Sequence, residues 1–334
     1  MKNYKGFIGS YTRDKSRGIR KFTFTNDSFE IEDFYAVENP TYLALDKNKE
    51  FLYSSMSKGD TQGVMSMDLN TLNVNEVLFS HENTPAHISV LEDYLLASNY
   101  HDGHLDLYGL SKHMVTKRLD SKTHTGEGPN KDRQKNAHIH FALKNPHNND
   151  ILTCDLGSDK VYIYEIKDDT LNKKGEIIFS PGSGPRHLCY AMDKNITYVF
   201  SELTSEIFVL EYKDHKYHQI QSVKTLPKDF YGENTGAAIR IHPNQKFIYV
   251  SNRGHDSIST LKIDDQYKLK LLSTISCGGD HPRDFNLTPD GKYLLSAHMT
   301  SNDLTLFKVN ELTGEISPIK EKIASPEPVS IVFL

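Results

Sequence analysis

Pro185-Arg-His-Leu188 is one of seven copies of a short phrase that recurs along a chain of 334 residues. The copies begin at Pro40, Pro85, Asn136, Pro185, Gly236, Pro282 and Pro328. The steps between them are 45, 51, 49, 51, 46 and 46 residues, a spacing typical of propeller blades rather than of helical repeats. Seven copies therefore predict seven blades.

Each repeat carries further landmarks after the phrase. A second strand ends in a small residue followed by a larger one, as in Ser201-Glu202. An alternating strand follows, as in Val161–Ile166, and a more polar strand closes the unit, as in Lys268–Ser273. Alternation with a period of two is the signal of strands that bury one face. We therefore expect four strands in each blade.

The seventh repeat is divided between the two ends of the chain. Residues 328–334 supply only an inner strand, while Gly6–Tyr11, Gly18–Phe24 and Phe29–Asp33 supply the other three. Without this closure the terminal blades would expose sheet edges that template aggregation. The sequence predicts an all-β fold, a seven-bladed β-propeller with four-stranded blades, closed by the N- and C-terminal strands in one blade. Because the repeats fill the whole length, we expect a single domain spanning residues 1–334.

Composition limits the kinds of partner. The formal charge of −5 without a basic run argues against nucleic acid or a membrane surface as the main partner. The three cysteines are odd in number, and the start of the chain lacks an apolar signal segment. These features predict a cytoplasmic protein. We also expect a monomer or a weak homo-oligomer. The absence of Trp and of Gly-His/Trp-Asp pairing removes the marks of the WD40 class.

Ionisable residues recur at the positions expected to surround the central channel. We expect the inner strands to line this channel, and the loops between first and second strands, with the second-strand ends, to open on one face. The charge is concentrated in blades three to six. The ionisable residues at these positions are His87, His138, Asp155, Arg186, His187, Glu202, Arg253, Arg283, Asp284 and His298.

Such a ring suits acyl-type chemistry on an anionic substrate. Arginine binds carboxylate or phosphate through two parallel hydrogen bonds and can stabilise a developing oxyanion. Glu202 or His138 could take a proton from water if its pKa lies near the working pH. A lone histidine on an inner strand is more often a packing residue, but burying several charges beside one channel is costly unless they are paired or used.

His138-Ile-His140 also raises the question of a metal. Residues i and i+2 of a strand share a face, and His-x-His is a familiar zinc element. No further ligand follows at tight spacing, although His87, His187 or Asp155 could supply one in space. We expect no metal and no cofactor.

A polar stretch from Asp120 to Lys135 interrupts the blade rhythm and contains Gly126-Glu-Gly-Pro129. It does not follow a strand and open a helix, as a loop that cradles phosphates would. Long insertions of this kind are typical of substrate lids or rims.

Several blocks of the sequence resemble one known family. They are Gly128–His140, Asp155–Asp159, Gly184–Leu188, Ser201–Leu203, Tyr249–Ser257, His281–Phe285 and Thr288–Leu294. The chain resembles the lactonase family of seven-bladed propellers, whose best-known activity is that of 6-phosphogluconolactonase. It is also similar to fungal 3-carboxy-cis,cis-muconate lactonizing enzyme. Ala137 stands where many relatives have Pro, and Ala238 where they often have Glu after paired alanines.

The resemblance implies a lactone hydrolase that works without metal. It places the functional positions at His138, with His140 close by, and at Arg186, Glu202 and Arg253. We expect 6-phospho-D-glucono-1,5-lactone as substrate, in the oxidative pentose phosphate pathway, with Glu202 or His138 activating water. Further substrate contacts are expected from His140, His187, Arg283, Asp155 and His298. The alternatives are a muconate-type lactonizing cycloisomerase and a non-catalytic propeller that binds a ligand or protein.

Overall fold

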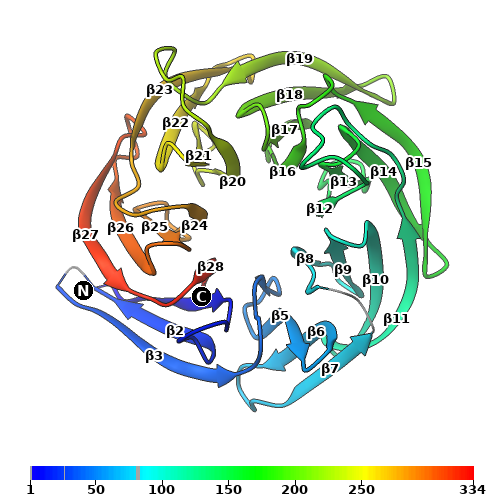
Figure 1. Cartoon of the computed structure of the whole chain (residues 1–334), viewed down its shortest axis with the longest axis vertical. Helices are drawn as coiled ribbons and strands as arrows, with labels where there is room; N and C mark the ends of the chain where they lie inside the picture. Colours follow the sequence, from blue (N-terminus) through cyan, green and yellow to red (C-terminus); the bar gives the residue numbers. More distant parts are fainter. Residues whose placement is uncertain (1, 26, 80–82) are drawn as a thin grey trace.

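The computed structural model describes residues 2–25, 27–79 and 83–334. Within these residues every strand of the seven sheets belongs to a four-stranded antiparallel blade, and the blades surround a central axis (Figure 1). None of the described residues is helical, so this part of the chain contains no helix that could cross a membrane. The predicted all-β, seven-bladed propeller is confirmed.

The first three blades follow one another along the chain, each from its inner to its outer strand. Blade 1 contains β4 (Leu43–Leu45), β5 (Phe51–Lys58), β6 (Thr61–Asp68) and β7 (Val74–Phe79). Blade 2 contains β8 (His87–Val90), β9 (Tyr94–Asn99), β10 (His104–Ser111) and β11 (Met114–Thr123). Blade 3 contains β12 (Ile139–Lys144), β13 (Ile151–Asp155), β14 (Lys160–Lys167) and β15 (Thr170–Ile178).

Blades 4 to 6 repeat this order, and blade 7 draws on both chain ends. Blade 4 contains β16 (Pro185–Tyr190), β17 (Ile196–Ser201), β18 (Glu206–Lys213) and β19 (Lys216–Lys224). Blade 5 contains β20 (Thr235–Ile241), β21 (Phe247–Arg253), β22 (Ser257–Ile263) and β23 (Leu269–Ser276). Blade 6 contains β24 (Pro282–Leu287), β25 (Tyr293–His298), β26 (Asp303–Val309) and β27 (Ile316–Ala324). Blade 7 contains β28 (Pro328–Phe333), β1 (Tyr4–Ser10), β2 (Gly18–Phe24) and β3 (Phe29–Ala36).

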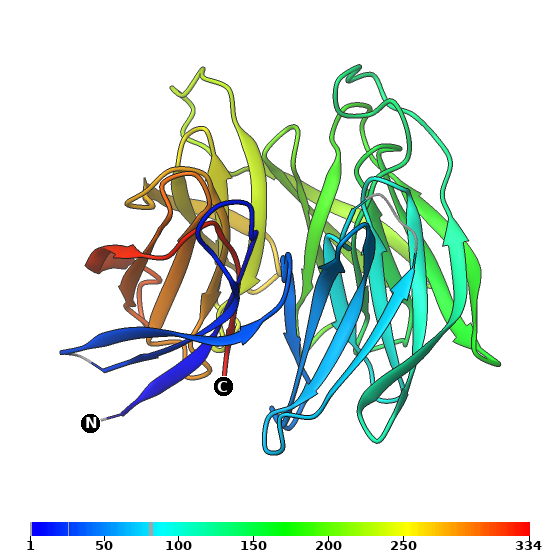
Figure 2. The same cartoon turned by 60° about the horizontal axis from the view of Figure 1, so that its bottom comes forward.

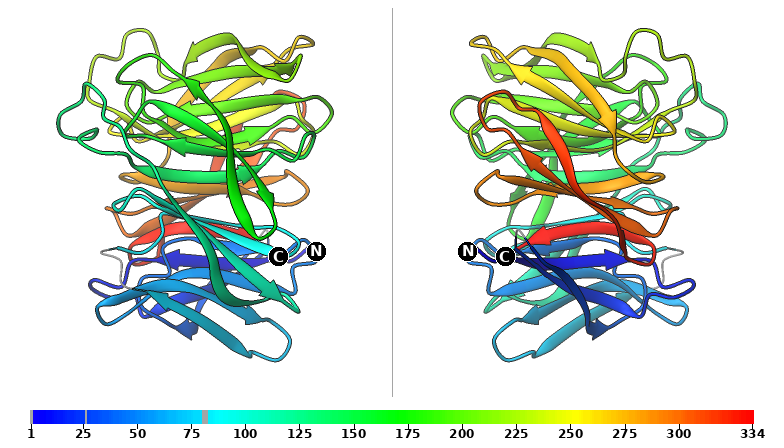
Figure 3. Two further views of the ribbon diagram at one scale, coloured as in Figure 1. Left: turned by 90° about the vertical axis from the view of Figure 1, so that its right-hand side faces the viewer. Right: turned by 90° about the vertical axis from the view of Figure 1, so that its left-hand side faces the viewer.

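The predicted closure of the ring is confirmed in blade 7. β28 pairs antiparallel with β1, with Ile8 opposite Ile331, so that the last and first strands of the chain lie side by side in one sheet (Figures 1 and 3). The buried Arg20 of β2 reinforces the join. Its Nη2 donates hydrogen bonds to Ser325 Oγ at 2.7 Å and to the carbonyl of Pro326 at 3.1 Å. The segment that leads into β28 is thereby tied to the N-terminal strands.

The core lies between the blades. Buried side chains form clusters that each draw on two neighbouring blades, so that every one of the seven blade interfaces contains one. Between blades 4 and 5, for example, Tyr198 and Val209 pack with Ile248 and Leu261. Each blade is therefore held by both neighbours, which gives the inner strands a rigid support.

The register of the blades decides which loops accompany the candidate residues. The start of each inner strand lies opposite the end of the second strand, as in the pairing of Pro185 with Ser201. The loops between first and second strands therefore lie on the opposite face of the ring. The prediction that these loops contribute to the site is wrong. The long connections 124–138 and 225–234, which join blades, rise together on the side where the inner strands begin (Figure 2).

Deleting residues 328–334 should leave an open, poorly soluble ring. The deletion removes the buried Val329, Ile331 and Phe333 and exposes the edge of β1. Side chains of this kind stabilise a fold by about 1.5–3 kcal/mol each, and the whole fold is stable by roughly 5–15 kcal/mol. Soluble yield and thermal unfolding measure the result, and a truncated protein with unchanged solubility and thermal stability would refute the closure.

A milder test replaces one side chain of the closing strand. Phe333→Ala should lower the free energy of unfolding by about 3–5 kcal/mol, as expected for a buried aromatic residue. Leu312 is 88% exposed, so Leu312→Ala is the control and should change little. Urea denaturation compares the two variants.

Candidate active site

A cavity of about 210 Å³ opens where the inner strands begin. Its charged lining residues are Arg13, Arg133, Arg186, Glu202, Arg253, Arg283 and Asp284. Five arginines against two carboxylates give the described lining an excess of three positive charges, although the whole chain has a formal charge of −5. A concentrated positive field in a concave site attracts anions. The cavity is therefore suited to an anionic ligand.

One buried carboxylate forms ion pairs with three of these arginines. Glu202 directly follows β17, and its Oε2 accepts a hydrogen bond from Arg186 Nε at 2.9 Å and forms an ion pair with Arg253 Nη2, also at 2.9 Å. Its Oε1 accepts from Arg133 Nη2. Arg186 lies on β16 of the same blade and Arg253 ends β21 of the next. Arg133 arrives from the connection between blades 2 and 3.

This arrangement leaves positive charge uncompensated. Burial alone would raise the pKa of Glu202, but the charges of Arg253, Arg186 and Arg133 outweigh it and lower this pKa to about 2. The carboxylate is therefore ionised at neutral pH. Burial lowers the pKa of Arg186 and the neighbouring Arg253 lowers it further. Three guanidinium groups share one carboxylate, so this cluster carries more positive than negative charge. An anionic ligand would supply the missing charge.

Two buried histidines of the inner strands also line the cavity. His187 Nε2 lies 3.0 Å from Arg186 Nη1. Because a guanidinium can only donate, His187 is neutral with its proton on Nδ1. Neither ring nitrogen of His140 is hydrogen-bonded to another described residue. Burial, then the charge of Arg186, lowers the pKa of both imidazoles well below the usual value.

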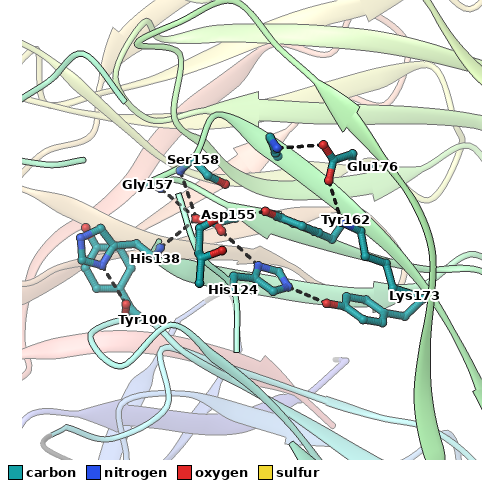
Figure 4. A network of polar contacts seen from close by, with 12 residues as sticks. Tyr100, His124, His138, Asp155, Gly157, Ser158, Tyr162, Lys173 and Glu176 are labelled. Carbon is teal, nitrogen blue, oxygen red and sulfur yellow. Dashed lines mark hydrogen bonds and ion pairs between the residues drawn. The ribbon is translucent and has the colours of Figure 1, made fainter. Parts of the chain in front are cut away.

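His138 takes a different position from His140. Its Nδ1 donates to the carbonyl of Tyr100 at 2.9 Å, and its ring stacks on that of Tyr100 at 4.4 Å between centroids (Figure 4). His138 is not among the residues that line the cavity. The register of β12 shifts between Ile139 and Phe141, which breaks the alternation expected for His138-Ile-His140.

In the described ranges, no three His, Cys, Asp or Glu side chains are grouped to hold a metal ion.

Asp155 stabilises the backbone beside the cavity instead of lining it. Its Oδ1 accepts hydrogen bonds from the amides of His138, Gly157 and Ser158, at 2.8, 3.1 and 3.2 Å (Figure 4). Its Oδ2 lies 3.0 Å from Nδ1 of the buried His124. The network therefore fixes the chain just before β12, the strand that carries His140.

His298 is also outside the cavity lining. Its Nδ1 lies 2.7 Å from Asp303 Oδ1, and its Nε2 lies 3.0 Å from Ser296 Oγ. Nine residues were predicted from the sequence to be catalytic or to contact the substrate, and the structure brings six of them to one cavity. These are His140, Arg186, His187, Glu202, Arg253 and Arg283. His138, Asp155 and His298 lie elsewhere.

Arg133 was not singled out from the sequence, although it lies in the polar stretch expected to form a rim. The first residues of that stretch, Asp120–Thr123, belong to β11, and the connection begins after them. Gln134 is fully buried and its Nε2 donates to Asp159 Oδ1 at 2.7 Å. The same Oδ1 accepts from the amide of Gly184 at 2.8 Å. Asp159 therefore joins the Arg133 segment to the turn that precedes β16 and Arg186.

Tyr11, Arg13 and Tyr100 also line the cavity without having been singled out as site residues. Tyr100 OH accepts a hydrogen bond from Arg133 Nη2 at 3.3 Å. The loops between second and third strands supply all three residues, and the sequence argument had not assigned these loops to the site.

Acidification from pH 7.5 to 5.5 should destabilise the protein. Burial and nearby arginines lower the folded-state pKa of His87, His140 and His187, so below the unfolded value near 6.5 the unfolded chain binds more protons. Each such histidine should cost about 1.4 kcal/mol for every pH unit below 6.5. The stabilisation is complete above that pH and is lost as the pH falls.

Urea denaturation at several pH values measures this slope. His140→Gln should reduce it, whereas replacing the exposed His215 by Gln should leave it unchanged. Stability that stays constant down to pH 5.5 would contradict the assignment of buried neutral imidazoles.

Comparison with known proteins shows the same architecture in relatives of the same length. Residues 5–333 match the family model described as lactonase, 7-bladed beta-propeller. The 6-phosphogluconolactonase of Bacillus subtilis (strain 168) is 33% identical to the chain over 349 aligned positions, covering 100% of this chain and 99% of the relative.

Two solved structures agree. A Lactobacillus plantarum protein has a TM-score of 0.94 and 31% identity, with complete coverage of both chains. A Bacteroides fragilis protein, named provisionally as a 6-phosphogluconolactonase, has a TM-score of 0.88 and 26% identity, with 99% of this chain and 98% of that one covered. The chain belongs to the lactonase family of seven-bladed β-propellers.

Proposed function

We propose that the protein hydrolyses 6-phospho-D-glucono-1,5-lactone to 6-phosphogluconate. The observation that carries the proposal is the buried Glu202 shared by three arginines, beside a neutral imidazole, in a cavity with excess positive charge. This site can bind an anionic substrate and stabilise the oxyanion that forms when water attacks a lactone carbonyl. The name of the full-length Bacillus subtilis relative supports the same substrate.

In the proposed reaction the arginines act as the electrophilic side of the site. The lactone carbonyl oxygen lies against the guanidinium groups of Arg186 and Arg253, which stabilise its negative charge in the tetrahedral intermediate. Glu202 holds these groups in position before the substrate arrives. Because the donors are already ordered, little reorganisation is needed when the charge develops.

The general base is assigned to His140. Both carboxylate oxygens of Glu202 are engaged by arginines, so this group is poorly placed to accept a proton from water. His138 does not line the cavity. His140 is neutral, lines the cavity, and has no hydrogen bond to another described residue.

In the proposed reaction His140 first accepts a proton and later returns it, so the imidazole ends in its starting state. His140 takes a proton from water as the water oxygen bonds to the carbonyl carbon. The ring carbon–oxygen bond then breaks, and the imidazolium returns its proton to the departing ring oxygen, which becomes a hydroxyl. The new carboxylic acid ionises at neutral pH.

Replacing His140 by Gln should lower kcat by on the order of a hundredfold or more, the scale expected for loss of a general base. Glu202→Gln should instead raise KM strongly and lower kcat as well, because three guanidinium groups lose their shared counter-charge. Steady-state hydrolysis, corrected for the spontaneous rate, measures both effects. The exposed His218 provides the control, and His218→Gln should behave as wild type.

A reversed pattern would contradict the assignment. If His138→Gln abolished turnover while His140→Gln retained it, the base would be His138. If Glu202→Gln lowered kcat without raising KM, Glu202 would be the base. Ring formation on a muconate without lactone hydrolysis would identify the lactonizing cycloisomerase, and substrate binding without turnover would identify a non-catalytic propeller.

Activity should not require a divalent metal. The chemistry proposed above uses only arginine, glutamate and histidine side chains, so hydrolysis should be unchanged after treatment with EDTA. Hydrolysis that disappears with chelator and returns with zinc would overturn this part of the proposal. The cytoplasmic location, the oligomeric state and the absence of nucleic-acid or membrane partners stay predictions.

A further inference from the structure

Two of the five cavity arginines are not bound to Glu202. Arg283 lies on β24 and Arg13 in the loop between β1 and β2. Both guanidinium groups face the ring of Tyr11, with their central carbons 3.7 Å (Arg13) and 5.9 Å (Arg283) from its centroid. In the part of the chain that the structure describes, neither side chain has a carboxylate within 4.0 Å.

The loop that carries Arg13 is fixed by its backbone. The amides of Arg13 and Asp14 donate to Glu327 Oε2 at 3.0 and 3.2 Å. The amide of Thr12 donates to Asn39 Oδ1 at 3.1 Å. Glu327 thus orders the backbone without pairing with the guanidinium of Arg13. The contact with Tyr11 adds a cation–π attraction that holds this side chain toward the cavity.

Arg283 is close enough to influence the arginine cluster electrostatically. Burial lowers the pKa of Arg253, and the charge of Arg283 lowers it further. Arg283 and Arg253 therefore repel one another across the same cavity, and Glu202 forms an ion pair with Arg253 but not with Arg283. An anion beside Arg283 would relieve this repulsion.

We propose that Arg283 and Arg13, with Tyr11 between them, form a separate anion subsite that binds the phosphate of the substrate. This inference rests on the proposed function and divides the cavity into two ends. The cluster on Glu202 binds the lactone, while the two arginines without carboxylate partners match a phosphate dianion in charge. Arginine is well suited to this because its planar group donates two parallel hydrogen bonds to phosphate oxygens.

The subsite should determine preference for a phosphorylated lactone over an unphosphorylated one. The test compares kcat/KM for 6-phospho-D-glucono-1,5-lactone and D-glucono-1,5-lactone. Arg283→Gln should lower the value for the phosphorylated lactone by tenfold or more, mainly through KM, and change the other less than twofold. Arg13→Gln should act in the same direction with a smaller effect, because this side chain is exposed.

Two further variants control for charge and folding. Arg283→Lys keeps the positive charge and should recover part of the preference. The exposed Arg17 does not line the cavity, and Arg17→Gln removes the same charge without changing either rate. Circular dichroism and thermal unfolding should confirm that each variant folds.

Calorimetric binding of 6-phosphogluconate and gluconate tests the subsite independently of turnover. Wild type should bind the phosphorylated acid more tightly, and Arg283→Gln should lose most of that difference. The subsite would be refuted if Arg283→Gln weakened the binding of 6-phosphogluconate and gluconate equally, or if it had no effect on 6-phosphogluconate binding. If the protein hydrolyses neither lactone, the proposed function fails, while the calorimetric comparison still decides whether these arginines bind phosphate.

Discussion

The pairing of β28 with β1 joins the two chain ends in one blade and closes the ring of seven four-stranded sheets. Each blade then packs on two neighbours through its own hydrophobic interface, and Arg20 ties the last connection to the first strands. This rigid ring lets Arg186 and Arg253, from different blades, reach one carboxylate. A looser scaffold could not keep several buried cations so close together, because their mutual repulsion favours separation and exposure to water.

The buried carboxylate of Glu202 explains why the cavity is both stable and suited to anions. It compensates part of the charge of three arginines, and its own pKa falls to about 2 as a consequence. A residue held in this way positions other groups better than it accepts protons. The neutral His140 is the complementary feature, since burial and the same arginines keep its imidazole unprotonated at neutral pH.

The repeat spacing was sufficient to predict the blade number, the four-stranded sheets and the divided seventh blade, because these follow from local alternation and from the need to close the ring. Arg186, Glu202 and Arg253 were also predictable, since Arg186 lies near the start of an inner strand and the other two lie at the ends of second strands, positions that recur in the repeats. The separation of His138 from His140 was not predictable, because it depends on a register shift in β12. Arg133 was missed for a related reason: its position depends on Gln134 and Asp159, contacts that no repeat pattern encodes.

A crystal structure with bound 6-phosphogluconate would test the account most directly. The account predicts the product in this cavity, with its carboxylate against Arg186, Arg253 and His140 and its phosphate between Arg283 and Arg13. Product bound outside the cavity, or with its phosphate on the Glu202 cluster and its carboxylate at Tyr11, would contradict it.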